Sequence, residues 1–369
     1  MGTESGKVLG RLMEIGLDFG LAVLSFFVVI GPLIFFHEMG HFLAARRFGV
    51  TVEEFGIGYP PRMLTLFERK GTKYTLNWIP LGGFMRPAGE DDPAIPGGLA
   101  AAPKRVRFAV LAAGPAANLL VAFILLAIMF MVGAPEQQPG AEITAVQTET
   151  PAEAAGLLPG DVILRVDDLV IDDYSQLGPY VYNKIGEPIT LMIRRGSETL
   201  EVELRLRSSW PEDQGPMGIG YQPVFRVQSY GFFQALGRAT REMWSLMETM
   251  ARIPALVIEQ QIPLRFLRPV SVVGISQLGG QAIDTSIQQN AAWPIIQLTA
   301  FISVALAITN LLPIPALDGG RILFVLIEAI RGKRMDPQRE MVVHFIGFAV
   351  LMLAMVVFVY LDIVDPLVQ

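Results

Sequence analysis

The sequence contains no cysteine, and only three of its 369 residues are histidine. Disulfides and thiolate ligands are therefore excluded, so any metal site must be built from imidazole and carboxylate groups. Charged residues are also scarce, at 17% of the chain, whereas 52% of the residues are hydrophobic. An ordinary soluble enzyme of this length is more polar. The composition therefore predicts a membrane protein.

The sequence also lacks an excess of basic residues. Its net charge is -6 and its pI is near 5.3. Because binding to phosphate requires a basic surface, this balance argues against nucleic acid as the main partner. The lipid bilayer is the partner that the composition predicts.

Four segments are apolar and long enough to cross a bilayer, which requires about 20 residues in a helix. They are residues 20–45, 108–135, 285–317 and 341–361. The first contains one acid, Glu38, and no obvious small-residue cleavage site, so we interpret it as a retained span rather than a signal peptide. The third is expected to begin as an interfacial stretch before the span itself.

Basic residues are concentrated in two short loops. Ten lie between the first and second spans, and Arg331, Lys333, Arg334 and Arg339 precede the last one. The positive-inside rule places both loops in the cytoplasm. The amino terminus, with only Lys7 and Arg11, and the long segment between the second and third spans are expected on the opposite side.

The middle of the chain has a different pattern. Short alternating or β-branched runs at 143–146, 162–166, 189–193 and 200–206 predict strands, and 152–155 and 175–183 have helical patterns. The run 151–163, PAEAAGLLPGDVI, resembles the signature of a bacterial PDZ domain. A generic small β domain is the alternative. We expect a PDZ-like domain at 137–222, between a first transmembrane half at 1–136 and an amphipathic connecting region at 223–284, with the second transmembrane half at 285–369.

A peptide-binding loop is expected beside the last strand of this domain. It would contain Met217, Gly218, Ile219 and Gly220, because glycines allow backbone N–H groups to converge on a carboxylate. A plain turn into the final strand explains the same glycines.

The most specific chemical signal is HEMGH at residues 37–41. On a helix, His37 and His41 are one turn apart on one face, so both imidazoles can reach one ion, with Glu38 beside it. Such an ionisable cluster is costly inside a membrane unless it has a function. Zinc at this site would activate a water molecule and polarise a peptide carbonyl. Glu38 would accept the proton of the water and pass it to the leaving amine.

A catalytic zinc usually has three protein ligands, so a third must be found. His344 is the remaining histidine, but it lies at the cytoplasmic edge of the last span, where an interfacial role explains it. Asp318 is the better candidate, because it ends a long uncharged segment and the two glycines after it allow close approach. A helix cap is the structural alternative for Asp318.

HEMGH and the later run NLLPIPALDGG, residues 310–320, together resemble the paired signature of the site-2 protease family of intramembrane zinc metalloproteases. The bacterial regulator of sigma-E protease is a member, and the form with a single PDZ domain matches best. Further matches are PLGGF at 80–84, GE at 89–90, GPAAN at 114–118 and PVS at 269–271. The resemblance implies His37, His41 and Asp318 as zinc ligands and Glu38 as the catalytic acid/base.

The resemblance also implies how a substrate is held. A membrane helix hides its carbonyls in its own hydrogen bonds, so it must be unwound and the freed groups satisfied. Residues 74–86 are expected to form a re-entrant β-hairpin whose edge, with Gly82, Gly83 and Phe84, pairs with the substrate. Asn310 would hydrogen-bond the substrate main chain. Close backbone packing is the alternative reason for Gly82, Gly83 and Asn118.

The expected fold is thus a polytopic α-helical membrane protein with about four transmembrane helices, a re-entrant β-hairpin and an inserted β-rich PDZ-like domain. By resemblance, its function is regulated intramembrane proteolysis in the bacterial inner membrane. The PDZ-like domain would act as a size filter, admitting trimmed anti-sigma factors or signal-peptide remnants already shortened by another protease.

Two other classes of protein are the alternatives. A catalytically inactive scaffold that carries a PDZ domain would not need Glu38 between the histidines. A metal transporter should repeat its ligands along several spans, but the sequence has one compact cluster.

Overall fold

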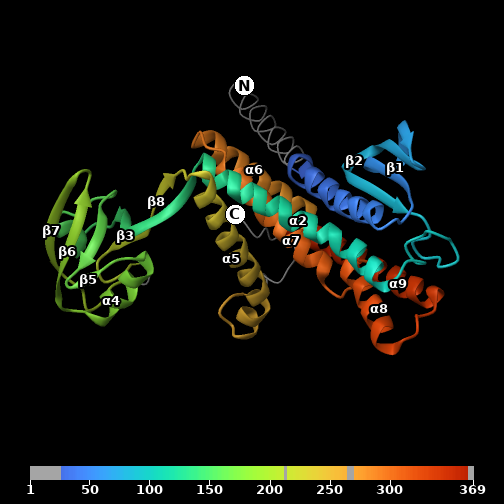
Figure 1. The fold of residues 1–369 in the computed structure, drawn as a ribbon. Helices are drawn as coiled ribbons and strands as arrows, with labels where there is room; N and C mark the ends of the chain where they lie inside the picture. Colours follow the sequence, from blue (N-terminus) through green and yellow to red (C-terminus); the bar gives the residue numbers. More distant parts are fainter. Residues whose placement is uncertain (1–25, 212–213, 264–269, 365–369) are drawn as a thin grey trace, which may run out of the picture. The chain divides into compact units, whose positions relative to one another are not determined.

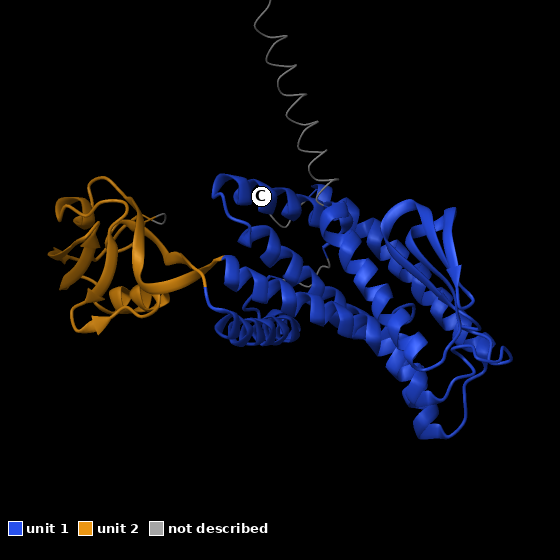
Figure 2. Cartoon of the chain, turned by 45° about the horizontal axis from the view of Figure 1, so that its top comes forward, with its two compact units in different colours: residues 1–132, 230–369 blue, residues 133–229 orange. Residues whose placement is uncertain are grey.

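The computed structural model, drawn in Figure 1, describes residues 26–211, 214–263 and 270–364. The chain forms two compact units (Figure 2): one comprises Met1–Val132 with Tyr230–Gln369, and the other is Gly133–Ser229. Lys7, Arg11, Pro269 and the beginning of the span expected at 20–45 lie outside the described residues.

Four helices are long and apolar enough to cross a membrane, each overlapping one of the expected segments. They are the N-terminal helix (Phe26–Arg47), α2 (Lys104–Val132), α7 (Trp293–Leu311) and α9 (Pro337–Val364). The second span begins four residues before the expected segment. It also ends three residues before that segment does, because a strand begins at Ala134, directly after Gly133 with its positive φ. The third is narrower than expected, because residues before Trp293 belong to a separate helix.

Three further helices belong to the same unit. They are α5 (Phe232–Ile258), α6 (Val272–Gln288) and α8 (Asp318–Arg331). The amphipathic connecting region expected at 223–284 therefore contains the long helix α5. The α6 helix begins at Ser271, whose hydroxyl accepts hydrogen bonds from the N–H groups of Val273 and Gly274. The α8 helix ends at Gly332, which has the left-handed conformation common after a helix.

The N-terminal helix, α2 and α7 run close together in the first unit (Figure 1). Phe26, Val29, Ile30 and Leu33 of the N-terminal helix form a buried cluster with Ile302 of α7. One turn of the same helix approaches α2 much more closely: a Cβ added to Gly40 would lie 2.3 Å from the Ala113 carbonyl oxygen. A glycine here lets the two backbones meet directly, which brings the HEMGH turn against α2.

The sheet of this unit is formed by β1 (Val52–Arg69) and β2 (Thr72–Pro87). A β-hairpin is thus present, but the expectation that residues 74–86 form it alone is wrong. These residues belong to its second strand, and the first strand begins 22 residues before the expected start. Glu54 of β1 pairs with both Lys73 and Arg86 of β2, so the first half of β1 lies between the two halves of β2. The order across the sheet is therefore 83–87, 52–57, 73–77 and 62–69.

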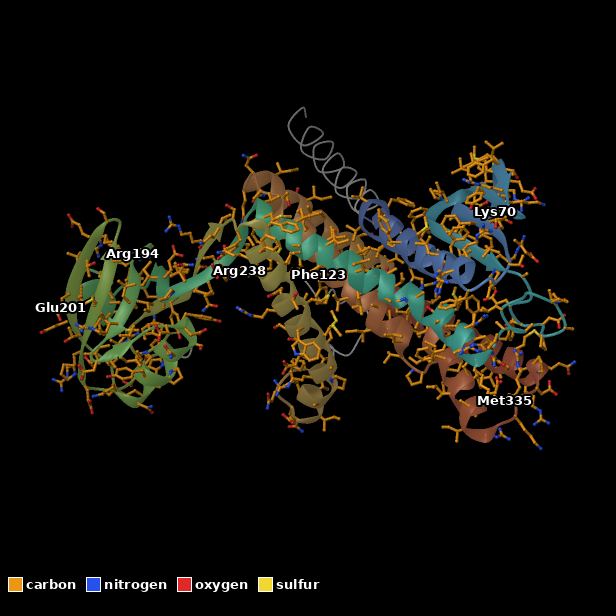
Figure 3. The ribbon with its side chains drawn as sticks, viewed as in Figure 1. Lys70, Phe123, Arg194, Glu201, Arg238 and Met335 are labelled. Carbon is orange, nitrogen blue, oxygen red and sulfur yellow. The ribbon has the colours of Figure 1, made fainter. Side chains whose placement is uncertain are left out.

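Two features hold this arrangement. Lys70 and Gly71 both have positive φ, as a tight hairpin turn requires, and Lys70 marks that turn in Figure 3. The buried Glu54 carboxylate accepts hydrogen bonds from Arg62, Arg86 and Thr75. The hydrogen bond from the Arg62 guanidinium is the main reason that the pKa of Glu54 lies below its ordinary value. Glu54 therefore remains ionised at neutral pH and binds both halves of the sheet.

The second unit is β-rich. Its elements are β3 (Ala134–Val146), α3 (Pro151–Ala154), β4 (Val162–Val166), β5 (Leu169–Val170), η1 (Tyr174–Gln176), α4 (Leu177–Asn183), β6 (Pro188–Arg195), β7 (Glu198–Arg205) and β8 (Ile219–Gln228). The sheet order is β7-β6-β4-β3-β8, antiparallel throughout, with β5 paired to β4. Ile143, Ile163 and Leu191 point into its core with at most 1% exposure, as their alternating pattern predicts.

Candidate metal centre

Three ligand-type atoms from two distant parts of the chain converge in the first unit. The Nε2 atoms of His37 and His41 are 3.1 Å apart. The Asp318 Oδ2 atom lies 3.1 Å from the first and 3.3 Å from the second. Asp318 reaches this position because it is the first residue of α8, after the turn that follows α7. All three side chains predicted as ligands therefore meet at one point.

The hydrogen bonds around the rings determine which nitrogen can bind a metal. His41 Nδ1 is 2.7 Å from the Val110 carbonyl oxygen, which only accepts, so Nδ1 carries the proton of the neutral ring. The Nε2 lone pair of His41 then faces the Asp318 carboxylate, whose Oδ2 is buried with no hydrogen-bond partner among the described residues. Lone pairs that converge in this way repel one another unless a cation lies between them.

The spacing of the three atoms is a test of whether zinc fits. In a tetrahedral zinc site with bonds of about 2.0–2.1 Å, neighbouring ligand atoms are about 3.3–3.4 Å apart. The observed distances of 3.1–3.3 Å are close to this value. Two imidazoles and one carboxylate leave a fourth position open, as in catalytic rather than structural zinc sites. The donor set therefore fits a catalytic zinc ion.

Glu38 lies in the same cavity, whose volume is about 340 Å³. It lines this cavity together with Met85 of β2. A carboxylate is therefore available beside the convergence point, where a general base would have to be. The remaining lining residues include Tyr59, Phe84, Glu90, Leu111, Asn310, Leu317 and Arg321.

The cavity contains two of the four residues predicted to hold a substrate. Phe84 and Asn310 line it, and the Asn310 carboxamide also donates to the Leu306 carbonyl of its own helix at 3.0 Å. Gly82 and Gly83 instead lie against the N-terminal helix: added Cβ atoms would be 2.3 Å from Ile34 Cβ and 3.2 Å from Glu38 Cβ, respectively. These glycines allow β2 to approach the N-terminal helix closely, as the packing alternative predicts.

His344, the other histidine considered as a ligand, lies outside this cluster. Its Nδ1 accepts a hydrogen bond from the Ala316 N–H at 2.9 Å, and its ring packs against Phe324. Ala316 has a φ of 79°, which is unusual for a residue other than glycine. His344 therefore holds the turn that delivers Asp318, rather than contacting the cluster itself.

Gly114 of α2 has a role that its motif alone did not reveal. A Cβ at this position would lie 2.3 Å from His41 Nε2 and 2.8 Å from His37 Nε2. It would therefore occupy the space in which a shared ion must sit. The sequence showed Gly114 only as part of GPAAN, because the contact joins residues from separate spans.

Replacing Gly114 by alanine is expected to prevent zinc from binding, because the new methyl group displaces the ion or both imidazoles. Zinc in the purified protein should fall well below the value of about one per chain expected for a single site, as measured by elemental analysis. Gly280→Ala is the matched control, since its Cβ meets nothing within 4 Å and it also lies in a helix. Full zinc content in Gly114→Ala would show that the site is not at this point.

The predicted peptide loop of the second unit borders a cavity of about 320 Å³. Met217, Gly218 and Ile219 line it together with Leu177 and Val181 of α4, whereas Gly220, the next residue of β8, is not among its lining residues. Gly218 has a φ of 80°, and a Cβ there would be 2.4 Å from Thr150. The loop thus needs glycine at this position for its backbone conformation. The cavity lies between a strand and a helix, where an extended peptide can be accommodated.

Comparison with known proteins gives consistent results. Residues 25–354 match the pattern of Peptidase family M50. The zinc metalloprotease RasP of Geobacillus kaustophilus is 29% identical, with 93% of this chain and 97% of the relative covered. The regulator of sigma-W protease RasP of Bacillus subtilis is 27% identical (92% and 98%), as is the metalloprotease MmpA of Caulobacter vibrioides (85% and 88%).

Among solved structures, the PDZ domain of an SdrC-like protein of Listeria monocytogenes is 23% identical, covers 23% of this chain and 87% of its own, and has a TM-score of 0.20. The family match is far more extensive. It includes the HEMGH helix, both strands of the first sheet and the turn that carries Asp318. The chain therefore belongs to Peptidase family M50, the site-2 protease family of intramembrane zinc metalloproteases.

Proposed function

We propose that this protein performs regulated intramembrane proteolysis of single-span membrane proteins in the bacterial inner membrane. The observation that carries the proposal is the position of the three converging side chains His37, His41 and Asp318, called the ligand triangle below. His37 and His41 belong to a helix long and apolar enough to span a bilayer, and Asp318 reaches them from the turn after another such helix. A peptide bond cleaved there lies at membrane depth.

The chain supplies the groups that such a reaction needs. His37, His41 and Asp318 would hold the zinc ion, which when bound activates water and polarises the scissile carbonyl. Glu38, which lines the same cavity, accepts the proton of the attacking water and returns it to the leaving amine. Asn310 borders the same cavity and offers its carboxamide to the substrate main chain.

The sheet offers a way to hold an unwound substrate. Residues 83–87 pair with β1 on one side, and on the other side no strand lies beside them within the described part of the chain. Phe84 and Met85 of this segment line the cavity that contains Glu38 and the ligand triangle. An extended substrate that pairs with this edge regains the backbone hydrogen bonds it lost on unwinding.

The charge distribution supports one orientation. The loop between α8 and α9, marked by Met335 in Figure 3, contains Lys333 and Arg334, and Arg331 is the last residue of α8. Basic loops of this kind stay in the cytoplasm. The active site then opens toward the cytoplasm, and the Gly133–Ser229 unit, which follows the second span directly, lies on the opposite side.

The substrates in this proposal are proteins that another protease has already shortened, such as trimmed anti-sigma factors or signal-peptide remnants. The Gly133–Ser229 unit would exclude bulky outer domains or bind a newly made peptide terminus in the cavity beside Met217. Regulation then depends on the size of the substrate outside the membrane rather than on its sequence within it.

A pair of model substrates tests this proposal. Both are single-span proteins with the amino terminus in the cytoplasm, one with a folded outer domain and one cut back to a short tail. We expect the reconstituted protein to cleave only the short form, as measured by gel analysis of the fragments. Equal cleavage of both forms would contradict the role of the Gly133–Ser229 unit as a size filter, but it would agree with the proposed protease activity. No cleavage of either form by zinc-loaded protein would contradict the proposed function.

A further inference from the structure

Three residues on one face of α2 lie against the HEMGH turn. Val110, Gly114 and Asn118 are spaced by four residues, so they project from the same side of the helix. The Val110 carbonyl accepts a hydrogen bond from His41 Nδ1. Gly114 has no side chain, so the space beside the two Nε2 atoms of His37 and His41 stays open. The third position, Asn118, lies against the other histidine: its carboxamide is 3.2 Å from His37 Nδ1.

The surroundings of Asn118 make this contact significant. The residue is 1% exposed and lies in the middle of a span, where water cannot take over a lost hydrogen bond. The carboxamide nitrogen faces His37 Nδ1, and the carboxamide oxygen is buried with no hydrogen-bond partner among the described residues. A buried amide in this position is costly unless one of its atoms is used.

Metal binding determines which carboxamide atom is needed. A neutral His37 that binds zinc through Nε2 carries its only proton on Nδ1, so Nδ1 must donate. A carboxamide N–H directed at Nδ1 would force the proton onto Nε2, into the triangle formed with His41 and Asp318. A half-turn of the carboxamide brings its oxygen to Nδ1–H at no steric cost, because the two ends of the group are nearly the same size.

We propose that Asn118 is a positioning residue whose carboxamide oxygen accepts a hydrogen bond from His37 Nδ1–H and so fixes the tautomer and orientation of this zinc ligand. It does for His37 what the Val110 carbonyl does for His41. Groups that accept from the second nitrogen of a zinc-bound histidine typically change metal affinity by about 10–100-fold. The inference rests on the proposed role of His37 as a ligand.

A second contact of Asn118 provides a matched control. Its backbone carbonyl accepts a hydrogen bond from the Ser303 hydroxyl of α7 at 2.8 Å, and Ser303 is fully buried. This contact anchors the same turn of α2 but does not involve the carboxamide. Ser303→Ala therefore disturbs the packing around Asn118 and leaves the group that faces His37 unchanged.

The experiment is a competition for Zn²⁺ between the purified full-length protein and a chromogenic chelator. Asn118→Leu has similar volume but no acceptor, and we expect its zinc dissociation constant to rise about 10–100-fold. Asn118→Ala is a second variant for the case in which the leucine variant does not fold, because alanine is too small to overfill the site. It should show the same loss of zinc affinity. Asn118→Asp should bind zinc at least as tightly as the natural protein, because a carboxylate is a stronger acceptor for Nδ1–H. Ser303→Ala should stay close to the natural value.

A role in packing alone predicts the opposite order. The aspartate would then be the most damaging substitution, since a buried charge in a span is costly without a partner, and leucine would be tolerated. Unchanged zinc affinity in Asn118→Leu, or an equal loss in the aspartate and leucine variants, would overturn the proposal. His37→Ala measured in parallel separates the two assignments, because full zinc affinity in that variant would overturn the ligand role of His37 instead.

Discussion

Replacing Glu38 by glutamine is expected to abolish cleavage of a transmembrane substrate while the protein keeps its fold and its zinc. Glutamine has nearly the same shape but cannot accept a proton from the attacking water, and general-base catalysis contributes about 10²–10⁴-fold to rates of this kind. The three converging ligand atoms do not include Glu38, so zinc content should stay at the natural level. Cleavage rate and zinc content are both measured on the reconstituted protein.

Glu90→Gln is the control for this substitution. Glu90 is a second carboxylate in the same cavity, but its nearest charged partner is Arg321, 2.5 Å away, rather than a ligand of the triangle. Loss of negative charge in the cavity is thus common to both variants, and only Glu38→Gln removes the proposed base. Undiminished cleavage by Glu38→Gln, or an equally large loss in Glu90→Gln, would contradict the mechanism.

Replacing Asp318 by alanine is expected to remove zinc as well as activity. The variant retains two imidazoles, too few for a stable catalytic site, which normally has three protein ligands. Elemental analysis should find zinc well below the level of about one per chain. Thermal unfolding gives an independent measure: zinc at a thousandfold excess over its dissociation constant stabilises a native protein by about 4.1 kcal/mol, and this stabilisation should disappear in Asp318→Ala.

His344→Ala separates a ligand from a residue that supports the turn. His344 contacts the Ala316 N–H and lies outside the ligand triangle, so the variant should still bind zinc. It loses only the hydrogen bond that holds the turn before Asp318. If Asp318→Ala kept its zinc and His344→Ala lost it, the assignment of the third ligand would have to be reversed.

The sequence was most informative where chemistry and local spacing coincide. HEMGH is a helical pattern, so the approach of His37 to His41 follows from 3.6 residues per turn. The expectation for Asp318 relied on weaker local signals, an uncharged run and two glycines, and the structure brings its carboxylate to both imidazoles. The four expected spans overlap the four candidate membrane helices for the same reason, since apolar length is a local property.

Contacts between distant segments could not be read in the same way. The pattern of the sequence does not predict the first strand, β1, because Pro60 and Pro61 interrupt its alternation. Its place between the halves of β2 depends on pairing alone. The separate helix α6 was partly merged with the third span, since both segments are apolar. Gly114 and Asn118 were visible as a motif, but their relation to the histidines arises only where α2 crosses the N-terminal helix.

The ligand triangle also has a consequence for the order of events during synthesis. Two of its corners, His37 and His41, are made before the Gly133–Ser229 unit, and the third, Asp318, is made only after the whole of that unit. A ribosome that stops early therefore releases a fragment that cannot hold the catalytic ion. The membrane is exposed to an active peptidase only after the unit proposed to restrict its substrates has been translated.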